Sequence, residues 1–170
     1  THLASSAASD VYKRQEHYLK KKKGAIIFDV KCSSQLPILI ENFGGTAIME
    51  KTGHFNIKKA IKKYNAILGG EMSGHIFINH DWYGFDDAIY TAVMLAKVIS
   101  DTDLPASNIV KQFPKTFTTP ELNLEVDDVS KFKMVEKFKE QMQFPNAELN
   151  TIDGVRISIG SSWGLMRASN

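Results

Sequence analysis

The sequence contains one cysteine and no long apolar run, and each shortage excludes a class of protein. Cys32 has no second cysteine with which to form an internal disulfide, which fits a reducing compartment. No run of apolar residues approaches the roughly 20 that a membrane-spanning helix needs. The chain does not open on a basic segment followed by an apolar one, as a secretory signal does. We therefore expect a cytoplasmic protein with no membrane span.

An excess of charge of one sign is also missing. The net charge is +2 over 170 residues, which is too small to indicate a nucleic-acid partner. The basic run at residues 20–23 is expected to be a solvated turn before a strand, because no aromatic residue is interleaved with it. What the sequence does contain is a hydrophobic fraction of 43%, which is sufficient for the core of one full domain or two small ones.

Residues 25–100 predict strands that alternate with helices. Residues 25–30 are apolar except for Asp29, as in a buried parallel strand. A helix over residues 33–43 follows, and Gly44 and Gly45 are expected to end it. Further strands are predicted at residues 46–49, 66–68 and 75–78, and further helices at residues 55–64 and 86–100. This order favours an α/β domain of three layers with a largely parallel, mixed sheet.

Two of these helices carry apolar residues on one face. In the helix at residues 55–64, Ile57, Ile61 and Tyr64 are expected to turn inward. The helix at residues 86–100 offers a wide apolar stripe, which comprises Ile89, Ala92, Val93, Ala96 and Ile99.

Residues 118–170 predict a second, smaller unit. The expected elements are a strand at residues 119–126, a helix at 128–143 and strands at 148–152, 155–159 and 163–167. Asp127 or Asp128 can cap the helix, and its apolar face comprises Phe132, Val135, Phe138 and Met142. This order favours a helix packed on an antiparallel sheet, which is an α+β domain.

We divide the chain into four segments. Residues 1–15 are rich in serine and alanine and have no apolar period, so we expect a non-native or disordered leader there. Residues 16–104 are assigned to the α/β domain, residues 105–117 to a linker, and residues 118–170 to the α+β domain. We expect this second domain to be truncated by the end of the chain.

The loop at residues 70–75, Gly-Glu-Met-Ser-Gly-His, carries the most informative chemistry. Its glycines let a backbone approach a ligand closely. Its carboxylate and its hydroxyl, two positions apart, can bond two neighbouring sugar hydroxyls, and its histidine can move a proton near neutral pH. An ordinary turn between strands has a similar composition, so the loop alone leaves both interpretations open.

Five segments, in order, resemble the third domain of the alpha-D-phosphohexomutase family. They are IFDVKCS at 27–33, GG at 44–45, KTGH at 51–54, GEMSGH at 70–75 and GFDD at 84–87. Met72 resembles the phosphomannomutase/phosphoglucomutase branch, whereas phosphoglucosamine mutases typically carry glutamine there. A phosphoglucosamine mutase and a non-catalytic sugar-phosphate-binding module remain the alternatives.

The resemblance implies roles for individual residues. In the family the loop at residues 70–75 binds the sugar, and the implied substrate-binding residues are Gly70, Glu71, Ser73 and Gly74. His75 is expected to orient the substrate or to transfer a proton near the reacting hydroxyl. Lys31, just past the first strand, and His54, at the start of a helix, complete the implied catalytic set, because a cation there suits a phosphate group.

The second region resembles the start of the family's phosphate-binding loop in the fourth domain. The matching text is DGVR at 153–156 and WGLMRASN at 163–170. The implied phosphate ligands are Arg167, Ser169 and Asn170, which offer a guanidinium fork, a hydroxyl and an amide. In the family this loop continues beyond the position of Asn170.

The resemblance implies an enzyme that interconverts hexose 1-phosphate and hexose 6-phosphate. In the family a phosphoserine donates its phosphoryl group, glucose or mannose 1,6-bisphosphate is the intermediate and an activator, and Mg²⁺ on an Asp-rich loop balances the charge. This sequence contains neither the serine loop nor the Asp-rich loop. We therefore expect the missing domains of the same polypeptide as partners, and no mutase activity from this chain alone.

No metal ligands are expected in this chain. Asp86 and Asp87 precede an apolar helix, where adjacent carboxylates usually cap the helix and charge its first turn. His80 and Asp81 have no partner at the spacing of a zinc site.

Overall fold

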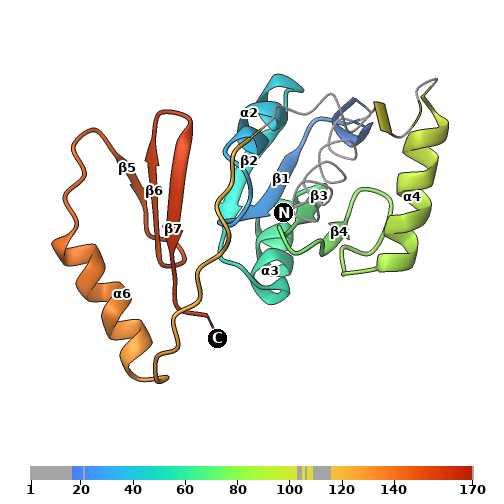
Figure 1. Cartoon of the computed structure of the whole chain (residues 1–170). Helices are drawn as coiled ribbons and strands as arrows, with labels where there is room; N and C mark the ends of the chain where they lie inside the picture. The colour runs from blue at the N-terminus through green and yellow to red at the C-terminus, as the bar shows by residue number, and fades with distance from the viewer. Residues whose placement is uncertain (1–16, 21, 103–104, 106, 109–115, 170) are drawn as a thin grey trace. The chain divides into compact units, whose positions relative to one another are not determined.

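The computed structural model describes residues 17–20, 22–102, 105, 107–108 and 116–169, and the chain divides into two compact units (Figure 1). The first unit runs from Thr1 to Thr118 and the second from Thr119 to Asn170. The leader predicted for residues 1–15 lies outside the described residues, as does much of the predicted linker.

A four-stranded sheet forms the centre of the first unit, with the strand order β2-β1-β3-β4. Its strands are β1 (Ala25–Asp29), β2 (Thr46–Glu50), β3 (Leu68–Gly70) and β4 (Ile76–Ile78). β1 pairs in parallel with both β2 and β3, whereas β3 pairs antiparallel with β4. The largely parallel, mixed sheet predicted from the sequence is therefore confirmed.

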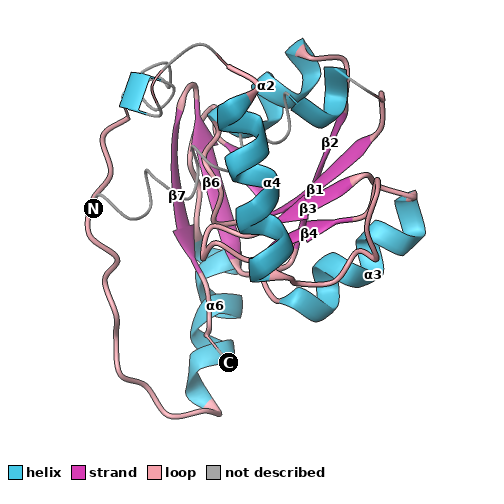
Figure 2. Cartoon of the chain, turned by 90° about the vertical axis from the view of Figure 1, so that its right-hand side faces the viewer, coloured by secondary structure: helices cyan, strands magenta, loops and turns pink. Residues whose placement is uncertain are grey.

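Helices cover both faces of this sheet, because successive residues of β1 point to opposite sides. Ile26 and Phe28 pack in one apolar cluster with Leu36 of α2 (Gln35–Asn42). Ile27 packs in the other cluster with α3 (His54–Tyr64). Figure 2 shows α2 and α3 on opposite sides of the strands. The result is the predicted three-layer α/β domain.

The helix ends follow the sequence signals. Gly44 adopts a φ of +76° and donates its backbone N–H to the carbonyl of Glu41 at 2.8 Å, which closes α2. The helix α4 (Ala88–Ser100) begins after Asp87, whose carboxylate accepts the backbone N–H of Tyr90 at 2.8 Å. The predicted cap of α4 is thus confirmed, although the helix begins two residues later than predicted.

The apolar stripe predicted for α4 is mostly exposed. Ile89 and Val93 are 81% and 60% exposed, whereas Met94 and Val98 are buried. The helix lies beside the edge strand β4 and therefore buries a narrow face at positions 94 and 98 rather than the wide predicted stripe. A helical period fixes the spacing of an apolar face, but the packing partner decides which face is buried.

The inward position predicted for Tyr64 is also wrong. Tyr64 is the last residue of α3 and is exposed, with Nζ of Lys63 4.6 Å from the centroid of its ring. Asn65 follows in a left-handed conformation that ends the helix and turns the chain. Ala60 is buried in addition to the two predicted isoleucines.

The second unit contains one helix and an antiparallel sheet of order β5-β6-β7 among its described residues. Its elements are α6 (Ser130–Gln141), β5 (Glu148–Asn150), β6 (Val155–Ile159) and β7 (Ser162–Met166). Asp127 accepts the backbone N–H groups of Val129 and Ser130 at 3.1 and 2.9 Å, so the predicted cap of this helix is confirmed. Of the predicted apolar face, Val135 is buried and Phe132 is exposed.

The strand predicted at residues 119–126 does not form. The segment has no regular structure, and its Leu122 and Leu124 side chains are 87% and 76% exposed. A strand needs a neighbour for its backbone hydrogen bonds, and no described strand pairs with this segment. Its alternation of apolar and polar residues is therefore insufficient by itself.

Candidate functional site

The loops that follow β1, β2 and β3 meet at one edge of the sheet, because the three strands are parallel. Ligands of α/β sheets usually bind at this carboxyl edge. Hydrogen bonds join the three loops directly. Met72, in the loop after β3, donates its backbone N–H to Oδ1 of Asp29 at 3.2 Å, and Thr52, after β2, donates its hydroxyl to Oδ2 of Asp29 at 3.3 Å.

Asp29 joins these loops, and the sequence analysis does not assign it to the site. It is buried at the end of β1 and accepts a third hydrogen bond, from Sγ of Cys32 at 3.0 Å. A buried carboxylate is tolerated only when donors surround it. The signal in the sequence was the single charged residue inside an otherwise apolar strand.

Glu71 is 2% exposed and faces the start of α3. Its Oε1 accepts the backbone N–H of Gly53 at 2.5 Å. The positive end of the α3 dipole favours a carboxylate at this position. The predicted sugar-binding carboxylate is therefore fixed in place by the loop after β2.

The tip of the β3–β4 loop is compact and exposed. The backbone N–H of Glu71 donates to the carbonyl of His75 at 2.9 Å, and the N–H of Gly74 donates to the carbonyl of Glu71 at 3.0 Å. Gly74 has a φ of +95°, which other residues rarely adopt. Ser73 is exposed at the tip, whereas Gly70 is buried in β3 and pairs with Ile76. The turn thus presents a hydroxyl to solvent beside a buried carboxylate.

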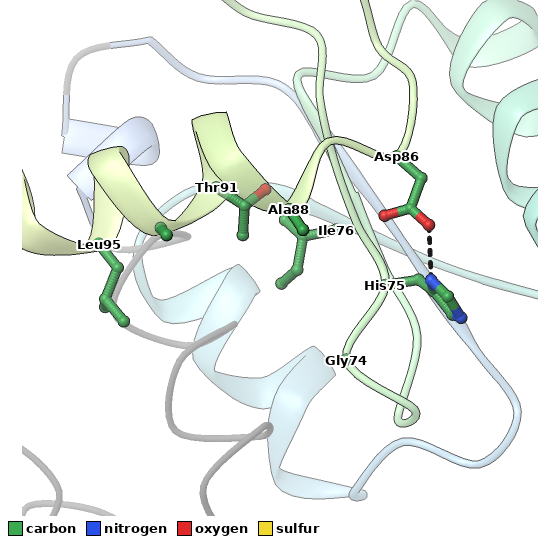
Figure 3. A pocket seen from close by; sticks show the side chains of 8 residues that line it. Gly74, His75, Ile76, Asp86, Ala88, Thr91 and Leu95 are labelled. Atoms are coloured by element: carbon green, nitrogen blue, oxygen red, sulfur yellow. Dashed lines mark hydrogen bonds and ion pairs between the residues drawn. The ribbon is translucent and has the colours of Figure 1, made fainter.

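The two predicted histidines lie near each other. The ring centroids of His54, the first residue of α3, and His75, the residue before β4, are 6.5 Å apart. Nδ1 of His75 is 2.6 Å from Oδ2 of Asp86. Figure 3 marks this interaction with a dashed line. Lys31 is half-buried two residues beyond Asp29, at the same edge of the sheet.

A pocket of about 390 Å³ lies beside this pair, between β4 and α4. Its lining includes the three successive residues Gly74, His75 and Ile76, and Asp86 and Thr91 face them from the α4 side. The floor is apolar, while the imidazole and the carboxylate lie together at one side (Figure 3). The pocket is open, so a small ligand in it would lie beside His75 and Asp86.

In the second unit, Arg167 is held by a carboxylate. Its Nε donates to Oδ2 of Asp153 at 3.2 Å, and both side chains are less than a fifth exposed. Gly154, at a φ of +82°, lets the chain pass close to β7, since a Cβ there would lie 2.3 Å from the carbonyl oxygen of Met166. Ser169 is exposed, and Asn170 lies outside the described residues.

Arg156, in strand β6, packs inside the second unit. It is buried, and its guanidinium carbon lies 3.8 Å from the centroid of the Trp163 ring. The two arginines of the predicted phosphate-binding region are therefore both fixed by neighbours in this unit. They differ in that Arg167 is the more exposed of the two.

No group of three or more His, Cys, Asp or Glu that could hold a metal occurs among the residues that the structure describes. Mg²⁺ prefers several oxygen ligands around one point, and the described carboxylates do not gather in such a group. Asp87 caps α4, and Asp86 pairs with His75. Within the same described part of the chain, no helix is both long and apolar enough to cross a membrane.

Comparison with known proteins places the chain in a family. Residues 2–117 match the model of the phosphoglucomutase/phosphomannomutase alpha/beta/alpha domain III. The match includes most of the segment for which the sequence predicts a leader. A phosphomannomutase/phosphoglucomutase of Pseudomonas putida is 49% identical over 153 residues, which cover 89% of this chain and 33% of that protein.

Two further relatives agree. A phosphoglucomutase of Neisseria gonorrhoeae is 43% identical over 155 residues, covering 89% of this chain and 34% of that protein. The crystal structure of a phosphoglucomutase/phosphomannomutase family protein from Burkholderia thailandensis superposes with a TM-score of 0.88 at 34% identity, covering 96% of this chain and 34% of that one. The chain spans about a third of the length of the curated relatives that it matches, and it belongs to the phosphoglucomutase/phosphomannomutase family.

Proposed function

We propose that this chain supplies the sugar-binding part of an enzyme that interconverts hexose 1-phosphate and hexose 6-phosphate, with mannose and glucose as the hexoses. The names of the relatives at 49% and 43% identity support this activity. The observation that carries the proposal is the fixed position of the β3–β4 loop, which Asp29 and Gly53 tie to the two neighbouring loops.

The sugar contacts are proposed for Glu71 and Ser73. One carboxylate oxygen of Glu71 accepts from Gly53, and a carboxylate has about four acceptor sites in all, so capacity remains for a sugar hydroxyl. Ser73 is exposed and can donate and accept. Gly70 and Gly74 keep the backbone free of side chains beside the ring.

The catalytic roles are proposed for Lys31, His54 and His75, the three basic side chains at this edge. Nε2 of His75 takes the proton of the reacting sugar hydroxyl as that oxygen bonds to the phosphorus of the phosphoserine. The bond between this phosphorus and the serine oxygen breaks in the same step, and the serine oxygen is the leaving group. Lys31 and His54 orient and neutralise a phosphate group, which at His54 lies near the start of α3. Positioning and charge stabilisation supply most of the rate in phosphoryl transfer.

The second unit is proposed to bind the phosphate that does not react. Arg167 uses Nε for Asp153, which leaves its terminal nitrogens for phosphate oxygens. Ser169 and Asn170 would add a hydroxyl and an amide. We assign the phosphoserine, Mg²⁺ and the glucose or mannose 1,6-bisphosphate intermediate to the whole enzyme, in the cytoplasm. The missing domains would hold the phosphoserine and the metal.

The test measures mutase activity of the full-length protein that contains this chain. A coupled assay would compare the 1-phosphates of mannose, glucose and glucosamine. The proposal expects turnover of the first two and predicts that Ser73→Ala lowers kcat/KM about 5-fold, the loss of roughly one hydrogen bond. Ser100→Ala, an exposed serine at the end of α4, is the control and is expected to keep wild-type kinetics.

Three outcomes would contradict the proposal. Preference for glucosamine phosphate would indicate a phosphoglucosamine mutase. Binding of hexose phosphate without turnover by the full-length protein would indicate a sugar-phosphate-binding module. Turnover by the purified 170-residue chain, with contaminating mutase excluded, would show that the missing domains are unnecessary.

A further inference from the structure

Asp86 is held beside His75 by the backbone. It follows the loop that leaves β4, yet its backbone forms an isolated antiparallel bridge to Phe77, two residues after His75. On its other side, Asp87 caps α4 through the N–H of Tyr90. Asp86 is thus fixed between a strand and a helix start, so its carboxylate has little freedom to leave the imidazole.

The hydrogen bond between these side chains defines one tautomer of the imidazole. Oδ2 of Asp86 is 2.6 Å from Nδ1 of His75, and an ionised carboxylate can only accept. The hydrogen must therefore be on Nδ1, which leaves Nε2 of the neutral ring with a free lone pair. The partner of one ring nitrogen decides what the other nitrogen can do.

Asp87, the residue after Asp86, does not bond to His75 in this way. Its Oδ1 accepts the N–H of Tyr90 at 2.8 Å, and its Oδ2 accepts Nε1–H of Trp82 at 3.2 Å. Both oxygens of Asp87 thus stabilise the start of α4 and the preceding loop. The two adjacent carboxylates therefore have separate partners, and only Asp86 contacts the imidazole.

We propose that Asp86 is a positioning residue, which holds His75 as the Nδ1–H tautomer and so presents Nε2 as the proton acceptor for a sugar hydroxyl. This role rests on the proposed function, because it is the mutase reaction that requires an acceptor. Asp86 touches neither sugar nor phosphate in this role. It acts through the orientation and the tautomer of His75.

The first test reads the tautomer directly. The 170-residue chain labelled with ¹⁵N-histidine would be measured by long-range ¹H–¹⁵N correlation, with His75→Gln to assign the signals. We expect the neutral His75 ring to be mainly the Nδ1–H form. Asp86→Asn, which keeps the shape of the side chain, is expected to abolish this preference, and Asp87→Asn is expected to preserve it, because asparagine also caps helices.

The second test measures kinetics in the full-length protein. Asp86→Asn is expected to lower kcat roughly 10- to 100-fold with KM nearly unchanged, as for the loss of part of a general base. Asp86→Glu should recover part of the rate, and Asp87→Asn should stay near wild type. A role limited to folding would instead change the melting temperature without separating kcat from KM.

The outcomes separate this proposal from the proposed function. A His75 ring in the Nε2–H form, or a tautomer unchanged by Asp86→Asn, overturns the positioning role whatever the enzyme does. Unchanged kcat for Asp86→Asn in an active full-length protein overturns it as well. Absence of mutase activity in the wild-type full-length protein overturns the proposed function and the acceptor role with it, while the tautomer measurement still tests the pair.

Discussion

Met72 donates its backbone N–H to the buried carboxylate of Asp29, with 3.2 Å between the nitrogen and Oδ1. The two residues are 43 positions apart in the sequence. The bond fixes the β3–β4 loop to the end of the first strand. Thr52 bonds the second oxygen of the same carboxylate, so a single side chain aligns the loops that follow β1, β2 and β3.

Replacement of Asp29 by alanine should therefore disturb both stability and binding. The change leaves the N–H of Met72 and the hydroxyl of Thr52 without their buried acceptor, which costs roughly 1–3 kcal/mol per site. Urea unfolding of the chain should show a lower midpoint, and titration with mannose 1-phosphate should show weaker binding. Asp101→Ala, whose side chain is about half exposed, is the control and should change stability by less than about 0.5 kcal/mol.

The layers of the first unit could be predicted from the sequence because local signals and long-range packing agree there. The apolar run of β1, the glycines after α2 and the cap at Asp87 each stabilise the same arrangement. The predictions that failed concern choices that the local sequence does not make. The helical period of α4 did not reveal which face meets β4, and the alternation at residues 119–126 did not supply a neighbouring strand.

The site could be predicted in part for the same reason. The motif residues Glu71, His75 and His54 do lie at one edge of the sheet, because parallel strands end together. The contacts made by Asp29 and Asp86 could not be predicted, since they join residues distant in the sequence. The sequence predicts that Asp86 and Asp87 both cap α4 or charge its first turn. In the structure Asp87 caps α4, whereas Asp86 pairs with His75.

Two valines of α4 test which face of the helix is buried. Val98 is 4% exposed and Val93 is 60% exposed, so the same substitution to alanine should have different effects. Val98→Ala should lower the free energy of unfolding by roughly 2 kcal/mol, because it removes buried methyl groups and leaves a cavity. Val93→Ala should change it by less than about 0.5 kcal/mol. The reverse order in urea unfolding would mean that the stripe predicted from the sequence is the buried one.

Gly154 should be intolerant of any side chain. Its φ is +82°, and a Cβ would lie 2.3 Å from the carbonyl oxygen of Met166 and 2.7 Å from Cβ of Arg167. Gly154→Ala should therefore lower the free energy of unfolding by about 1–3 kcal/mol. It should also shift the NMR signals of Arg167 and Asp153. Gly164→Ala, with no heavy atom within 4 Å of the new Cβ, is the matched control. Equal stability of the two variants would contradict the geometry of this turn.

The start of α6 should respond to acid through Asp127. The hydroxyl and the backbone N–H of Ser130 hold the pKa of Asp127 below its ordinary value of 3.8. A carboxyl whose pKa is lower in the folded state stabilises that state fully above the ordinary value. This stabilisation is lost as the pH falls through the lowered pKa.

A titration by NMR can follow this loss, because the amide proton of Ser130 reports the charge of its acceptor. The midpoint should lie below 3.8, and Asp127→Asn should remove the titration while it keeps the helix, since asparagine caps as well as aspartate does. Asp128→Asn should leave that midpoint in place, because Asp128 pairs with Lys131 at 2.8 Å and not with Ser130. A midpoint at or above 3.8 would mean that Asp127 does not cap α6 in solution.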